Sequence, residues 1–140
     1  MSTVLWANIL VNEKVEIDNA DKYYLYKYAK KLDRLTNQLQ VSSFISLQDF
    51  TDVEFNFSNK ELPDGMESTT DVMAKSGVWV DGSVAAEMLE KLIDHISDKD
   101  IRFGLLKNSH DEVLYELKES LKWALKAKSE NGKFNFSVVT

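Results

Sequence analysis

The sequence contains no cysteine. Disulfide bonds, thiol catalysis and zinc–thiolate sites are therefore excluded, and the composition fits a reducing compartment. No apolar run approaches the roughly 20 residues that a membrane-spanning helix needs. The first residues, MSTVLWANILVN, have neither a basic lead-in nor a small-residue cleavage site, so we expect no signal peptide and a cytoplasmic protein.

Proline occurs once, at Pro63, and the five glycines are scattered. No Gly/Ser-rich linker or low-complexity tract divides the chain. Its 140 residues, with 44% hydrophobic and 29% charged side chains, are sufficient for one domain with a real core. We therefore expect residues 1–140 to form a single domain.

The common catalytic motifs are also missing. There is no G-x-S-x-G, no phosphate-binding G-x-x-x-x-G-K, no G-x-G-x-x-G and no H-E-x-x-H. The two histidines, His95 and His110, do not have the spacing of a helical zinc site. His110 stands beside Asp111, but the sequence offers no nucleophile for it to activate. The catalytic residues, if there are any, stay unknown, and we expect no cofactor and no resident metal.

Apolar segments at both ends of the chain predict strands. Residues 3–11 (TVLWANILV) and 133–139 (KFNFSVV) are rich in β-branched and aromatic residues. Residues 15–17 are a candidate continuation of the first strand after a turn at Asn12–Glu13. In residues 51–57, Val and Phe alternate with Asp, Glu and Asn, which predicts a half-buried strand with its carboxylates facing solvent.

Helical spacing and capping signals predict four helices between these strands. The first covers residues 20–39 behind an Asp18–Asn19 cap, and a short one covers residues 69–76 between Ser68 and Gly77. A third follows Asp81 or Ser83, and the last begins at the capping box Ser109-x-x-Glu112 and ends at Asn131–Gly132. We expect an α+β fold. Its small mixed or antiparallel sheet has the terminal strands at its centre and packs against three longer helices and one short helix.

The segment from Asp49 to Asp71 concentrates the negative charge. It holds seven acids and one base, Lys60, so its net charge of −6 equals that of the whole chain. A calcium loop starting at Asp64 would need oxygen ligands where Met66 and Lys75 stand, so that pattern fails. The predicted partner-binding residues are Asp49, Phe50, Asp52, Glu54, Glu61, Asp64, Glu67 and Asp71.

Three interpretations of this segment stay open. The plainest is a solvated strand face followed by a polar loop. A second is a magnesium site using one or two of Asp49, Asp52 and Glu54. The third is a docking face for a basic partner, with Phe50 on the same side of the strand as the acids, because interfaces combine an aromatic centre with a charged rim.

Four bases on the first long helix form a secondary basic face, namely Lys27, Lys30, Lys31 and Arg34. They can hold a phosphate or a carboxylate, or they can be an ordinary solvated face. Together with the acidic segment they make the chain asymmetric in charge, so head-to-tail self-association is possible.

The low sequence pI of 4.9 argues against direct binding of nucleic acid. We predict a non-enzymatic protein-binding module that docks a basic protein through residues 49–71. Small, acidic, cysteine-free bacterial immunity proteins and nucleic-acid mimics resemble it in size and charge only. The alternatives are a metal-dependent or small-ligand-binding enzyme, with its site between the sheet and the loop at Trp79, and a self-assembling structural protein.

Overall fold

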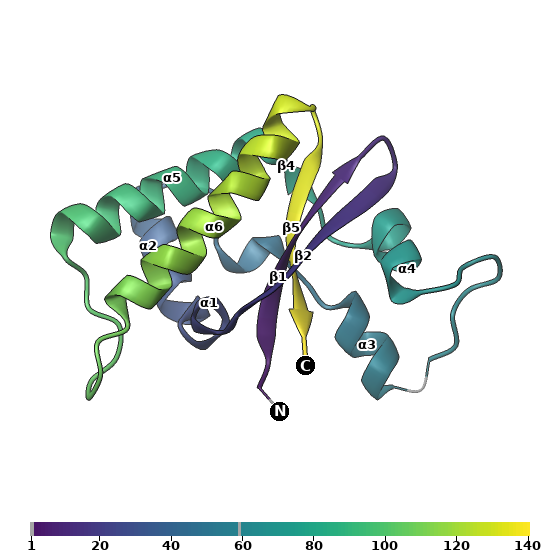
Figure 1. Cartoon of the computed structure of the whole chain (residues 1–140), viewed down its shortest axis with the longest axis horizontal. Helices are drawn as coiled ribbons and strands as arrows, with labels where there is room; N and C mark the ends of the chain where they lie inside the picture. Colours follow the sequence, from purple (N-terminus) through teal and green to yellow (C-terminus); the bar gives the residue numbers. More distant parts are fainter. Residues whose placement is uncertain (1, 59) are drawn as a thin grey trace.

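Two strands open the chain, and pairs of helices separated by single strands follow them (Figure 1). The computed structural model describes residues 2–58 and 60–140. The strands are β1 (Val4–Val11), β2 (Lys14–Lys22), β3 (Gln48–Asp49), β4 (Val80–Asp81) and β5 (Lys133–Val139). The helices are α1 (Tyr23–Lys27), α2 (Ala29–Leu39), α3 (Thr51–Phe57), α4 (Thr69–Ser76), α5 (Gly82–Lys99) and α6 (His110–Ser129), with a 3-10 turn at Ile45–Leu47.

The sheet has the order β2-β1-β5-β3, and β4 also pairs with β5. β1 is antiparallel to both β2 and β5, whereas β3 runs parallel to β5. The two terminal strands therefore lie at the centre, and the predicted α+β fold with a small mixed sheet is confirmed. β5 is the strand that β1, β3 and β4 all contact, so it connects distant parts of the chain.

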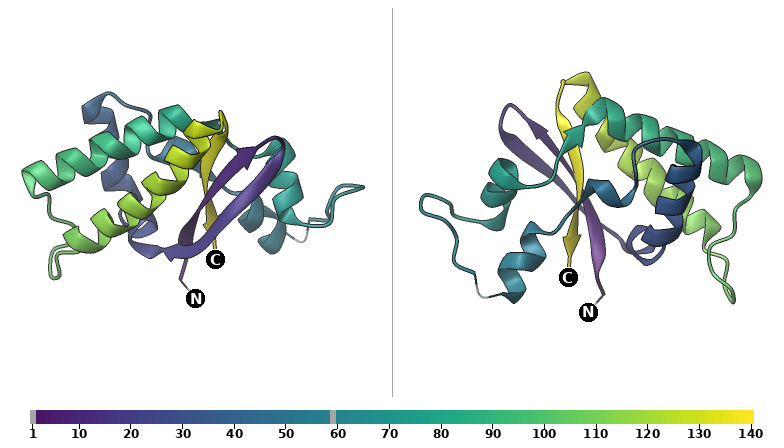
Figure 2. Two further views of the ribbon diagram at one scale, coloured as in Figure 1. Left: turned by 45° about the horizontal axis from the view of Figure 1, so that its top comes forward. Right: turned by 180° about the vertical axis from the view of Figure 1, so that it is seen from behind.

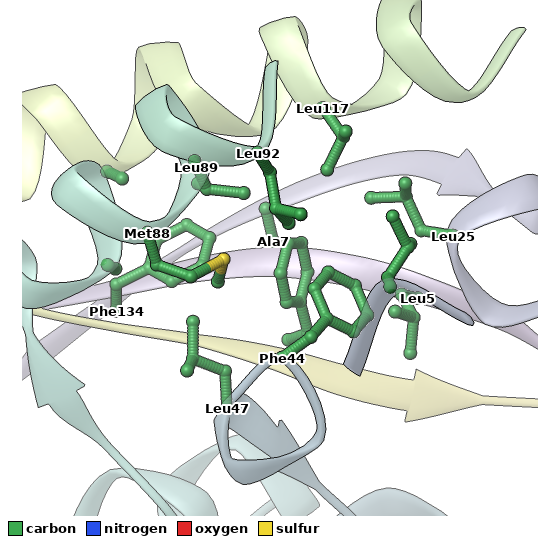
Figure 3. Close-up of a cluster of buried hydrophobic side chains, with 14 of the residues drawn as sticks. Leu5, Ala7, Leu25, Phe44, Leu47, Met88, Leu89, Leu92, Leu117 and Phe134 are labelled. Atoms are coloured by element: carbon green, nitrogen blue, oxygen red, sulfur yellow. The ribbon is translucent and has the colours of Figure 1, made fainter. Parts of the chain in front are cut away.

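One face of the sheet forms the apolar core. Leu5 and Ala7 of β1 and Phe134 of β5 are completely buried there. They pack against Leu89 of α5 and Leu117 of α6, and the 3-10 turn adds further buried side chains (Figure 3). Helices α1, α2, α5 and α6 lie on this side, and α3 and α4 lie on the other (Figures 1 and 2).

The opposite face of the sheet is polar but equally buried. Asn8 of β1 donates from Nδ2 to Asn135 Oδ1 and to Ser137 Oγ of β5, both at 3.0 Å. Asn135 donates in turn to the carbonyl oxygen of Val78, at 2.8 Å. Because these side chains hydrogen-bond one another, polar residues are tolerated beneath α4. Because both faces of the two terminal strands are largely buried, buried and exposed positions do not alternate along them.

Several predicted boundaries agree with the structure. The short helix α4 covers residues 69–76 as predicted, and Ser68 Oγ accepts the Asp71 N–H at 3.3 Å. The last helix begins at His110, but the predicted capping box is wrong. Ser109 makes no side-chain cap; instead Asn108 Oδ1 accepts the N–H of His110 at 3.1 Å.

The first helix differs more. The strand β2 extends to Lys22, so the helix starts at Tyr23 rather than at residue 20, and it is interrupted at Tyr28. Asp18, which the sequence assigned to a helix cap, accepts a hydrogen bond from Lys22 Nζ at 2.7 Å. Lys22 is only 2% exposed, and Asp18 pairs with this buried charge at the end of β2.

Glu116 connects α6 to α1. Its Oε1 accepts the N–H of Leu25 at 3.0 Å. Burial raises the pKa of Glu116 from 4.5 to about 7, although the N–H groups of Leu25 and Tyr24 and the charge of Lys22 act in the opposite direction. Between these two pH values the folded chain keeps a proton that the unfolded chain has released. This carboxyl group therefore stabilises the fold most below pH 4.5, and the contribution is lost as the pH rises to about 7.

We predict that Glu116→Gln removes this pH dependence while keeping an acceptor for Leu25. The free energy of unfolding of the variant, measured relative to that of the parent, should be about 1 kcal/mol higher at pH 8 than at pH 4. This value is reduced for the partial exposure of the group. Urea unfolding of both proteins at the two pH values measures this difference. A stability difference that is the same at both pH values would contradict the prediction.

Candidate functional site

The acidic segment begins with a helix, so the predicted strand over residues 51–57 is wrong. Asp49 Oδ2 accepts the N–H of Thr51 at 3.1 Å, and the Phe50 carbonyl oxygen accepts the N–H of Glu54 at 2.9 Å. These two bonds turn the chain into α3 directly after β3. Asp52 and Glu54 then lie in the first turn, where the helix dipole favours acids.

Helices α3 and α4 and the connection between them form a lobe on the polar side of the sheet (Figures 1 and 2). We call residues 51–58 and 60–76 the acidic lobe. It lies apart from α5 and α6. Six of the eight predicted partner-binding residues belong to it, namely Asp52, Glu54, Glu61, Asp64, Glu67 and Asp71. The structure therefore places most of the predicted carboxylates in one part of the molecule.

Asp49 is not available to a partner. It is 2% exposed, and Oδ1 accepts the N–H of Val78 at 2.9 Å and the hydroxyl of Thr51 at 3.1 Å. A Cβ added at Gly77 would lie 2.9 Å from the same oxygen, so glycine allows this approach. Since Thr51 starts the lobe and Val78 follows it, the Asp49 carboxylate connects the two ends of the lobe.

Three further carboxylates have partners within the lobe. Asp52 accepts from Thr69 Oγ1 at 3.1 Å and from Asn56 Nδ2 at 3.0 Å, which joins α3 to α4. Glu54 pairs with Lys60, and Asp71 accepts the N–H of Glu67 at 2.9 Å.

The remaining carboxylates face solvent. Those of Glu61, Asp64 and Glu67 accept no hydrogen bond from any described residue. Phe57, which the strand pattern had turned inward, is 67% exposed, and Leu62 is also exposed. The exposed surface of the lobe therefore combines free carboxylates with apolar side chains.

The Phe50 side chain lies in a hollow whose lining includes no acid, although the Phe50 carbonyl oxygen accepts the N–H of Glu54. Phe50 lines a groove of about 600 Å³ formed by α1, α2 and the segment 45–50, together with Tyr26 and Ile45. We call this groove the basic groove, because its lining includes all four residues of the predicted basic face, Lys27, Lys30, Lys31 and Arg34. The structure brings these four bases together, and it places Phe50, which the sequence analysis grouped with the acids, beside them.

A smaller cavity, of about 290 Å³, lies between the lobe and the sheet. Trp6, Asp52, Asn56 and Thr69 contribute to its lining. Trp79 does not line this cavity; it donates its indole N–H to the carbonyl oxygen of Met73 in α4, at 2.8 Å. The cavity is the space that best corresponds to the small-ligand alternative.

Among residues 2–58 and 60–140, no three His, Asp or Glu side chains are grouped so that they could hold a metal ion. His110 Nδ1 lies 2.6 Å from the carbonyl oxygen of Ile101, beside α6 and remote from the lobe. In the same ranges, every helix is too short or too polar to cross a bilayer.

We predict that Asp49→Ala loosens the lobe. The substitution leaves the N–H groups of Thr51 and Val78 without an acceptor and should cost about 2 kcal/mol. Amide hydrogen exchange at Val78 should accelerate more than exchange at Leu92 in the core. Asp64→Asn, which changes a charge that makes no hydrogen bond, is the matched control and should change neither quantity. Unaltered exchange at Val78 in Asp49→Ala would show that the carboxylate does not hold the ends together.

Comparison with known proteins gives this chain no relative. No family model, no curated protein and no solved structure matches it significantly.

Proposed function

We propose that this chain is a non-enzymatic protein-binding module whose acidic lobe docks a basic protein surface. The observation that carries the proposal is the exposed part of the lobe. There, the unpartnered carboxylates of Glu61, Asp64 and Glu67 lie in the same short segment as the exposed side chains of Phe57 and Leu62.

This combination suits recognition in two steps. Carboxylates without internal partners attract a basic surface over a distance and raise the rate of encounter. An exposed aromatic side chain then supplies apolar area that is buried in the complex, which slows dissociation. The rate of this encounter should therefore fall as salt is added, because exposed charges are screened beyond about 10 Å at 0.1 M salt.

The bonds of Asp49 and Asp52 favour binding further. They connect the ends of the lobe and its two helices before any partner arrives. A surface that is ordered in advance loses less conformational entropy on binding. An acidic surface of this kind suits a protein that blocks a basic enzyme, such as an immunity protein that blocks a nuclease toxin, and we propose that class for this chain.

The enzyme alternative is weaker. The cavity beneath the lobe contains one carboxylate, Asp52, and both of its oxygens already accept hydrogen bonds. No histidine or lysine lines that cavity. The lining therefore lacks a free general base, although a small polar ligand still fits the space.

The test uses the tagged chain to capture proteins from its native cell, followed by binding kinetics with each captured protein. Glu61→Gln/Asp64→Asn/Glu67→Gln should slow association about tenfold at low salt. Phe57→Ser should mainly accelerate dissociation.

The matched control is Glu90→Gln/Asp94→Asn/Asp98→Asn, which makes the same change of charge on exposed positions of α5. It should bind like the parent. The proposal fails if both triple variants weaken binding equally, or if the captured partner associates at the same rate in low and high salt.

A further inference from the structure

The loop between α5 and α6 carries an unusual pair of side chains. Leu105 and Leu106 are 95% and 102% exposed, so no described part of the chain covers them. Isolated exposed leucines are common, but two adjacent leucines at a loop tip form a small continuous apolar surface.

This loop has a defined conformation. Arg102 donates from Nε to the carbonyl oxygen of Gly104 at 2.7 Å and from a terminal nitrogen to that of Leu105 at 2.9 Å. Phe103 is buried, and its N–H donates to Asn108 Oδ1 at 2.9 Å. The backbone around the leucines is thus held by internal bonds while the leucines themselves point into solvent.

The surface next to this tip is basic and aromatic. A hollow of about 660 Å³ runs from Leu105, Leu106 and Lys107 to Tyr23, and it shares Lys27, Tyr28 and Gly104 with the basic groove. No aspartate or glutamate lines either hollow. The bases that do so are Lys27, Lys30, Lys31, Arg34 and Lys107. We call the two hollows and the leucine tip the basic face.

Not all of these charges are equally free. Lys31 donates to the carbonyl oxygen of Arg102, and Lys107 lies 3.3 Å from Glu112. Lys27 lies 5.5 Å from the centre of the Tyr28 ring. Lys30 and Arg34 make no ion pair with any described residue, and both are exposed.

The basic face and the acidic lobe are separated in space. The loop that carries the leucines projects at one end of the molecule, and α3 and α4 lie at the other (Figures 1 and 2). A surface that contacts the leucine tip therefore meets the basic face while the acidic lobe stays away from it.

We propose that the basic face docks on an anionic phospholipid bilayer, with Leu105 and Leu106 inserted at the boundary between headgroups and acyl chains. The bases then lie over the lipid phosphates, and Tyr23 and Tyr26 lie at the headgroup level, where tyrosine is favoured. A bilayer fits better than an acidic protein because both leucines, 95% and 102% exposed, stand on a projecting loop beside a group of bases. Insertion of two leucines is weak by itself, so binding requires anionic lipid and is reversible.

The experiment is co-sedimentation with vesicles of phosphatidylcholine alone and of phosphatidylcholine with about 30% phosphatidylserine, at low and at physiological salt. The parent should bind only the anionic vesicles, and more weakly at higher salt. Leu105→Ser/Leu106→Ser should lower the partition coefficient at least tenfold without changing the thermal midpoint, because neither side chain packs on the fold. Lys27→Gln/Lys30→Gln/Arg34→Gln should lower it as well.

Two control variants separate this face from general effects of charge and apolarity. Lys14→Gln/Lys75→Gln/Lys128→Gln removes three exposed bases elsewhere, and Val84→Ser/Leu125→Ser removes two exposed apolar side chains on α5 and α6. Both should bind the anionic vesicles like the parent.

Three results would overturn the proposal: no vesicle binding, equal binding to neutral vesicles, or equal losses in the test and control variants. Capture of an acidic protein by the basic face without vesicle binding would also overturn it. The triple variant of Glu61, Asp64 and Glu67 should bind vesicles normally, so this proposal and the proposed function can fail independently.

Discussion

The buried carboxylate of Asp49 is the constraint on which the acidic lobe depends. It accepts hydrogen bonds from residues that lie before and after the lobe, Thr51 and Val78. The strands on either side, β3 and β4, both pair with β5. A long excursion of the chain therefore leaves and rejoins the sheet at neighbouring points. Its position is set by these polar contacts together with the buried apolar side chains of Val72 and Met73 in α4.

The two charged surfaces divide the molecule by chemistry. The acidic lobe packs on the polar side of the sheet, whereas the basic groove is formed by helices on the apolar side. The net charge of −6 conceals this separation. Because the surfaces lie on different elements, each can bind without covering the other.

Much of the fold could be predicted because the relevant signals are local. The terminal strands and α6 follow from propensity and periodicity, and α4 follows from its Ser68 cap. Residues 51–57 could not be assigned in this way, since seven residues fit both periods and the deciding hydrogen bonds come from Asp49 and Phe50. The sequence analysis named the four bases of the basic groove but did not place Phe50 with them, because only the tertiary fold brings Phe50 beside them.

The polar underside of the sheet has a consequence for how such a chain can change during evolution. Asn8 donates to both Asn135 and Ser137, so the polar side chains of this layer find partners within the sheet itself. During evolution, the acidic lobe above this layer can change in length and in surface charge while the apolar core on the other side of the sheet keeps its packing. Binding specificity can therefore change here without any substitution in the apolar core.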